Sequence, residues 1–190
     1  MNAFINPYPK LFDFANGLSI HSPWLANKEA ATKRAHAVLK LLSIDAINAL
    51  AENNMVVVVS DSISDLSQYG QLNRLADGRL AVTLDPIMLR AHRLEMPLHQ
   101  DDAVTSVILT LIEASKIILE KYDGHEIGMD MLSEDEHYRI QLVAATYLFN
   151  KGRIKDAHKR ASTRTKSVCR MIKLETVART FRKKLAHKLA

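Results

Sequence analysis

Two stretches decide the fold: residues 101–124, DDAVTSVILTLIEASKIILEKYDG, and residues 133–152, SEDEHYRIQLVAATYLFNKG. The first opens with two aspartates that can cap a helix, and its apolar stripe is too wide for a surface helix. In the second, Ser133 and Glu136 have the spacing of a capping box, and Gly152 suits a helix C-terminus. The two stretches therefore predict a central pair of helices.

The chain before this pair carries the signals of helices, a strand and a hairpin. Residues 28–50 place apolar side chains near a 3.6-residue period, with a possible break at Ser43. Residues 55–59, MVVVV, are a short β-branched run typical of a strand buried on both faces. Asp77-Gly78 predicts a tight hairpin turn, which needs positive φ. Asp85-Pro86 predicts a capped short helix after the hairpin.

The two ends of the chain differ from this core, residues 28–152. Residues 1–27 contain three prolines and scattered aromatic residues, and we expect an irregular N-terminal arm that lies on the body or binds a partner. Residues 153–190 predict a basic amphipathic helix after a polar beginning. Its apolar residues are spaced 3, 4, 3 and 4: Met171, Leu174, Ala178, Phe181 and Leu185. This stripe either docks on the body or pairs with another copy or another protein.

The predicted fold class is therefore α+β and predominantly helical. A small β-sheet or hairpin packs on the central helical pair, and a basic helix ends the chain. The composition, with 47% apolar and 25% charged residues, is ordinary for a globular protein.

Charge is distributed unevenly along the chain. Residues 1–149 hold 12 Lys and Arg against 19 Asp and Glu, a net charge of −7. Residues 150–190 hold 14 Lys and Arg against two acidic residues, a net charge of +12. Such asymmetry indicates a polyanionic partner. The alternative is that the basic tail packs on the acidic body or is only a solvated face.

The single cysteine and the N-terminus bear on the compartment. Cys169 excludes an internal disulfide framework and fits a reducing cytosol. Residues 1–10 lack a basic region followed by an apolar core, so we expect no signal peptide and a cytoplasmic protein. Lys166, Arg170 and Lys173 near Cys169 would favour its thiolate, but no partner base is suggested nearby.

Motifs for catalysis or metal binding are absent from the sequence. It contains no G-x-x-x-x-G-K-[ST] loop, no G-x-G-x-x-G and no G-x-S-x-G. His125, Glu126, Asp130 and His137 could cluster around one turn, but a zinc site needs three or four converging ligands. We expect no metal site and no cofactor.

The predicted order of elements resembles the minimal zincin-type metallopeptidase domain of many phage and mobile-element proteins. The resemblance covers residues 28–152, and the family's long helix carries H-E-x-x-H. Here Ile112 and Lys116 stand at both histidine positions, and Glu113 stands at the position of the general base. Isoleucine offers no lone pair, and a lysine ammonium repels a cation. The resemblance therefore implies a fold that has lost its catalysis.

We predict a non-enzymatic protein, with regulation as one expected role, that binds the phosphate backbone of DNA or RNA through its C-terminal helix without reading bases. The alternative is a protein-binding module, such as an inhibitor, adaptor or virion component, whose tail seeks an acidic protein or a second copy. The predicted phosphate contacts are Arg160, Arg164, Lys166, Arg170, Lys173, Arg179, Arg182, Lys183 and Lys184.

Overall fold

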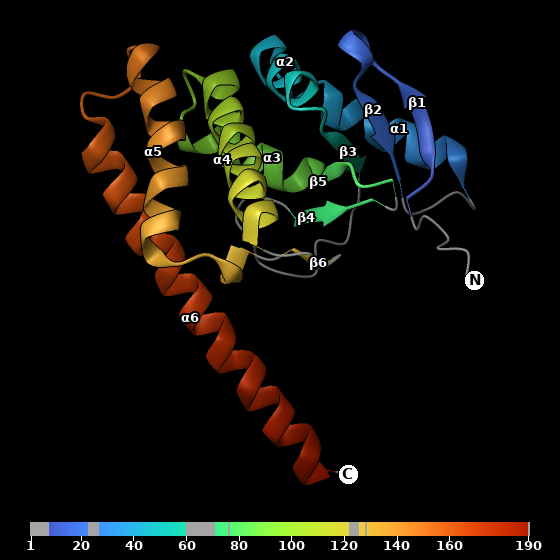
Figure 1. Cartoon of the computed structure of the whole chain (residues 1–190). Helices are drawn as coiled ribbons and strands as arrows, with labels where there is room; N and C mark the ends of the chain where they lie inside the picture. Colours follow the sequence, from blue (N-terminus) through green and yellow to red (C-terminus); the bar gives the residue numbers. More distant parts are fainter. Residues whose placement is uncertain are drawn as a thin grey trace.

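A six-stranded mixed sheet lies beside a group of helices (Figure 1). The computed structural model describes residues 8–22, 27–59, 71–75, 77–121, 126–127 and 129–189. The strands are β1 Lys10–Asp13, β2 Ser19–His21, β3 Val56–Val59, β4 Gln71–Arg74, β5 Leu80–Leu84 and β6 Glu126–Ile127. The helices are α1 Lys28–Leu39, α2 Ile44–Glu52, α3 Pro86–Glu95, α4 Gln100–Lys121, α5 Glu134–Asn150 and α6 Ala157–Leu189. Two 3-10 turns, Ala15–Gly17 and Met129–Met131, complete the described elements. The predicted α+β, predominantly helical fold is confirmed.

The sheet is built around β3. Its order is β1-β2-β3-β5-β4-β6, and β3 runs parallel to both neighbours while the other pairs are antiparallel. All four valines of β3 are buried, as predicted for a strand covered on both faces. Val57 and Val59 join the large core with the helices, whereas Val56 and Val58 belong to a smaller cluster on the other face.

Local sequence signals define most element boundaries. The hairpin of β4 and β5 turns at Gly78, which has a φ of +83°. Asn27 accepts a hydrogen bond from the Ala30 N–H at the start of α1, and Ser43 caps α2 at the predicted break. The side chain of Asp85 accepts from the Ile87 N–H ahead of α3.

The central helical pair is confirmed as α4 and α5. Helix α4 buries twelve of its 22 residues, so it lies inside the core. It begins at Gln100, and the two aspartates expected to cap it occupy its first turn. Helix α5 begins with the predicted capping box of Ser133 and Glu136. It ends at Asn150, and the chain turns at Gly152, which has a φ of +68° and is followed by Arg153, whose N–H donates to the Leu148 carbonyl.

The prediction that residues 1–27 form an irregular arm is wrong for residues 8–22. They form β1 and β2, and Ile20 pairs with Val57 at the centre of the sheet. Leu18 and Ile20 are at most 1% exposed. Strands of three or four residues are too short to show a periodic signal, and these two depend on pairing: β1 pairs with β2, and β2 pairs with β3. Residues 1–7 and 23–26 lie outside the described part of the chain.

Helix α6 begins earlier and extends further than expected. It starts after Asp156, whose side chain accepts from the Lys159 N–H, and runs for 33 residues. Its first half packs on α5, and its second half projects past the body (Figure 1). The boundary placed at residue 153 therefore separates segments that are packed together. None of the described helices is both long enough and apolar enough to cross a membrane.

Candidate nucleic-acid interface

The first half of α6 is held on the body by a narrow face of small residues. Ala161, Thr165 and Val168 are buried, and Ile172 packs against the core. Their spacings of 4, 3 and 4 place them on one side of the helix. The Thr165 hydroxyl donates to the Ala161 carbonyl, so this side chain leaves no unpaired group in the contact. Burial of this face orients the rest of the helix surface toward solvent.

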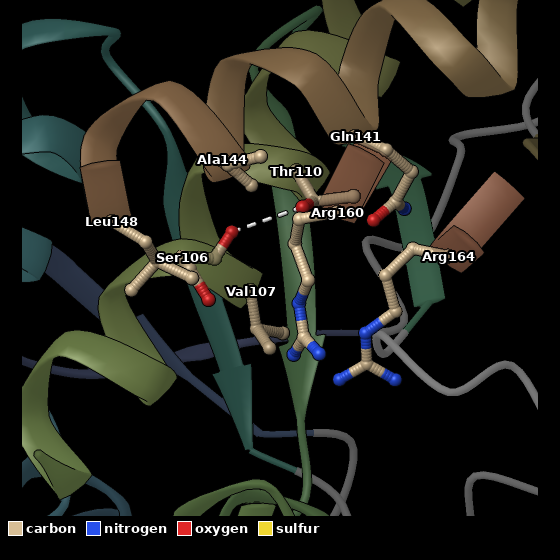
Figure 2. A pocket seen from close by; sticks show the side chains of 9 residues that line it. Ser106, Val107, Thr110, Gln141, Ala144, Leu148, Arg160 and Arg164 are labelled. Atoms are coloured by element: carbon tan, nitrogen blue, oxygen red, sulfur yellow. Dashed lines mark hydrogen bonds between the residues drawn. The ribbon is translucent and has the colours of Figure 1, made fainter. Parts of the chain in front are cut away.

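Two of the predicted phosphate contacts, Arg160 and Arg164, anchor α6 to the body instead. Both guanidinium groups pair with the carboxylate of Glu95 at the end of α3, with 3.6 Å between Arg160 Nη2 and Glu95 Oε2. Figure 2 shows the two side chains running side by side away from α6. Their side chains are only 35% and 22% exposed. A carboxylate of the same chain already pairs with both guanidinium groups, so these two predicted contacts are engaged within the chain and do not join the solvent-facing basic residues.

The basic residues just before α6 also form ion pairs with acidic residues of the body. Lys151 Nζ lies 2.9 Å from the Asp45 carboxylate, and Arg153 Nε lies 2.6 Å from that of Asp102. Tyr147 stands within hydrogen-bond distance of both aspartates, and burial raises the pKa of its hydroxyl. The alternative that the basic tail packs on the acidic body therefore holds for the beginning of the C-terminal segment.

A cavity of about 30 Å³ lies between α4, α5 and the anchoring arginines (Figure 2). Gln141 is 4% exposed, and its Nε2 has no hydrogen-bond partner among the described residues. The Thr110 hydroxyl donates to the Ser106 carbonyl, so its lone pairs remain available. The space suits an ordered water that accepts from Gln141, and it is too small for an organic ligand.

Four basic side chains share the opposite, solvent-facing side of α6. Lys166, Arg170 and Lys173 are exposed, and their spacings of 4 and 3 place them on one helix face. Lys159 is also exposed and lies seven residues before Lys166, so it continues the same row. We call these four residues the basic face. At 1.5 Å per residue the row extends about 21 Å along the helix.

The remaining predicted contacts lie further along α6. Arg182 is exposed, but its spacing from Lys173 turns it to another side of the helix. The backbone of Arg179, Lys183 and Lys184 is helical, and their side chains lie outside the described part. The structure thus brings together three of the nine predicted residues and adds Lys159. Lys159 could have been predicted from its seven-residue spacing to Lys166, but only with the knowledge that the helix begins at Ala157.

The apolar stripe of α6 does not dock on the body. Leu174 is 62% exposed and Phe181 is 67% exposed, and Ala178 is exposed as well. Met171 is half-buried, and the side chain of Leu185 lies outside the described part. Docking on the body, one of the two expectations for this stripe, is wrong for its described exposed residues, because the body contacts the helix through the face of Ala161 instead.

No protein-family model, curated protein or solved structure matches this chain. The resemblance to zincin-type peptidases therefore stays a prediction. At the position of the family's general base, the Glu113 carboxylate lies 3.3 Å from Arg139 and 3.9 Å from Lys116. Glu113 thus pairs with Lys116 on its own helix and with Arg139 on α5, so it joins the two central helices.

The described histidines and the cysteine bear on the predicted metal site and thiolate. No cluster of metal-ligating side chains occurs in the described part of the chain, and the His125 and Glu126 side chains lie outside it. His137 is buried, and this burial lowers its pKa and favours neutral imidazole. Burial, together with the charge of Glu134, raises the pKa of Cys169, so the expected thiolate is disfavoured.

Proposed function

We propose that this chain binds the phosphate backbone of nucleic acid through the basic face of α6, in a non-enzymatic role. The observation that supports this most directly is the row of Lys159, Lys166, Arg170 and Lys173 on the solvent side of a helix anchored at its other side. Residues 150–190 carry a net charge of +12, so long-range electrostatic attraction to a polyanion also supports the proposal.

The expected mode of binding is electrostatic. Lysine and arginine contacts to phosphate position a protein on a duplex or a single strand without reading the bases. The α6 basic face is rigid because the anchoring face of Ala161, Thr165 and Val168 holds the helix on α5. Binding should therefore tolerate different sequences and weaken steeply with salt.

Charge reversal on the basic face tests the proposal. Lys166→Glu, Arg170→Glu and Lys173→Glu together should weaken binding to a labelled duplex by at least about tenfold, measured by fluorescence anisotropy at low salt. The matched control is Lys28→Glu, Lys33→Glu and Lys40→Glu on and beside α1, which changes the net charge equally at other exposed positions. Equal losses in both variants, or no binding by the wild-type protein, would reject the interface.

A protein-binding module remains the second candidate. The observation that favours it is the exposure of Leu174, Val177 and Phe181 on the same helix, since phosphate binding does not use apolar side chains. Retained polyanion binding after these residues are changed would separate the two roles.

A further inference from the structure

The cavity beside the two anchoring arginines is positively charged (Figure 2). It has a volume of about 30 Å³ and is lined by residues of α4, α5 and α6. Its polar lining consists of Ser106 and Thr110 from α4, Gln141 from α5, and Arg160 and Arg164 from α6. Among the described residues, no acidic side chain lines it. The charge of the arginines is therefore not opposed from within the cavity.

The two arginines also outnumber the carboxylates that pair with them. Both guanidinium groups pair with the same oxygen of Glu95, Oε2. The other oxygen, Oε1, lies 3.5 Å from His92 Nδ1. Neither arginine pairs with a second carboxylate among the described residues. One positive charge is thus left over on partly buried side chains, where water solvates it poorly, so the cavity favours an anion.

Gln141 provides a second, independent observation. Its side chain lies on the cavity wall and is 4% exposed, and its Nε2 has no hydrogen-bond partner among the described residues. An amide NH₂ group has two donors, and buried donors of this kind are normally paired. An acceptor within the cavity would pair this amide.

A water and an anion differ in what they satisfy. The Ser106 and Thr110 hydroxyls donate to carbonyls of α4 at 2.7 and 2.9 Å, so their lone pairs suit an ordered water in part of the space. That water also accepts from Gln141, but it leaves the extra charge of the arginines unbalanced. A small anion accepts from Gln141 and balances this charge. The volume exceeds the about 10–15 Å³ that one water requires, so a halide ion fits.

We infer that this cavity is a binding site for a single halide ion, which is chloride in ordinary salt solutions. The Gln141 amide donates to the ion, and the positive charges of Arg160 and Arg164 attract it. Since these groups belong to α5 and α6, the bound ion stabilises the packing of the first half of α6 on the body. The inference does not depend on nucleic-acid binding.

The first test compares the thermal midpoint of the full chain in sodium chloride and in sodium gluconate at equal ionic strength. Gluconate is too large for this cavity, so only chloride can bind the folded chain there and raise its midpoint. The wild-type protein should melt about 3 °C higher in chloride at about 0.3 M, and bromide should act like chloride.

Two variants and one control assign this effect to the cavity. Gln141→Leu removes the amide, so its midpoint should be the same in both salts. Gln141→Glu places a tethered carboxylate beside the arginines, so it should lose the chloride dependence without melting below wild type in gluconate. The matched control, Gln100→Leu, changes the first residue of α4 outside the cavity and should keep the full difference.

The second test locates the ion. Anomalous diffraction from crystals of the full chain grown in sodium bromide should show one bromide ion within hydrogen-bond distance of Gln141 Nε2. Equal midpoints of the wild-type protein in the two salts would overturn the inference. A chloride effect that survives in Gln141→Leu would show a general salt effect, and a cavity that holds only water in bromide would likewise reject the site.

Discussion

Glu136 makes two separate contacts at the start of α5. Its carboxylate accepts from the Ser133 N–H at 2.9 Å and completes the capping box, and it also pairs with Lys121 at the end of α4. One residue thus joins a local helix signal to the packing of the central pair. The Lys121 ammonium, followed by the Ser133 N–H, lowers the pKa of Glu136 from 4.5 to about 2.

This pKa predicts how acid weakens the fold. Because the folded pKa lies below the unfolded value, the contribution of ionised Glu136 is complete above about pH 4.5 and is lost as the pH falls through about 2. Glu136→Gln should therefore be less stable than wild type near neutral pH, and the difference should shrink across this window. Urea denaturation of both proteins at several pH values measures it. A difference that does not change with pH would mean that the charge of Glu136 contributes nothing.

At the scale of elements, the predictable parts are those with a local chemical cause. Ser133 and Glu136, the valine run of β3 and the Asp77-Gly78 turn each specify a structure within a few residues. The missed parts depend on partners distant in sequence. Strand β2 exists because Ile20 pairs with Val57, and nothing within residues 19–21 indicates that pairing.

The candidate interface was predicted only in outline for the same reason. The excess of Lys and Arg located it in α6, but the orientation of that helix depends on its packing face. That face consists of Ala161, Thr165 and Val168, which carry a weaker apolar signal than the exposed Leu174 and Phe181. Glu95, which forms ion pairs with two of the predicted arginines, lies in α3. The sequence of the C-terminal segment alone gives no sign of this pairing.

Helix α6 should divide into a part that stabilises the body and a part that does not. Ending the chain after residue 172 removes only residues outside the packing face and should change the free energy of unfolding by less than about 0.5 kcal/mol. Ending it after Gly152 also removes buried Val168 and should cost at least about 2 kcal/mol. Urea denaturation of the three proteins tests this division. Equal stability of all three would show that the first half of α6 is not part of the core.

At the scale of the whole molecule, the structure separates the charges that the chain carries. The beginning of the C-terminal segment is neutralised by the body, through Asp45, Asp102 and Glu95. The solvent side of α6 keeps its positive charge and extends beyond the acidic body (Figure 1). A polyanion is therefore expected to engage α6 along its basic face while the body stays outside the contact.

The salt dependence of binding tests this account most directly. If the four residues of the basic face each neutralise one phosphate, the logarithm of the affinity of the full chain for duplex DNA should fall against the logarithm of salt concentration with a slope of about −3 to −4. Raising the salt from about 50 mM to about 200 mM should then weaken binding about a hundredfold. A slope near zero, or no binding at the lower salt concentration, would contradict the proposal that α6 is a phosphate-binding surface.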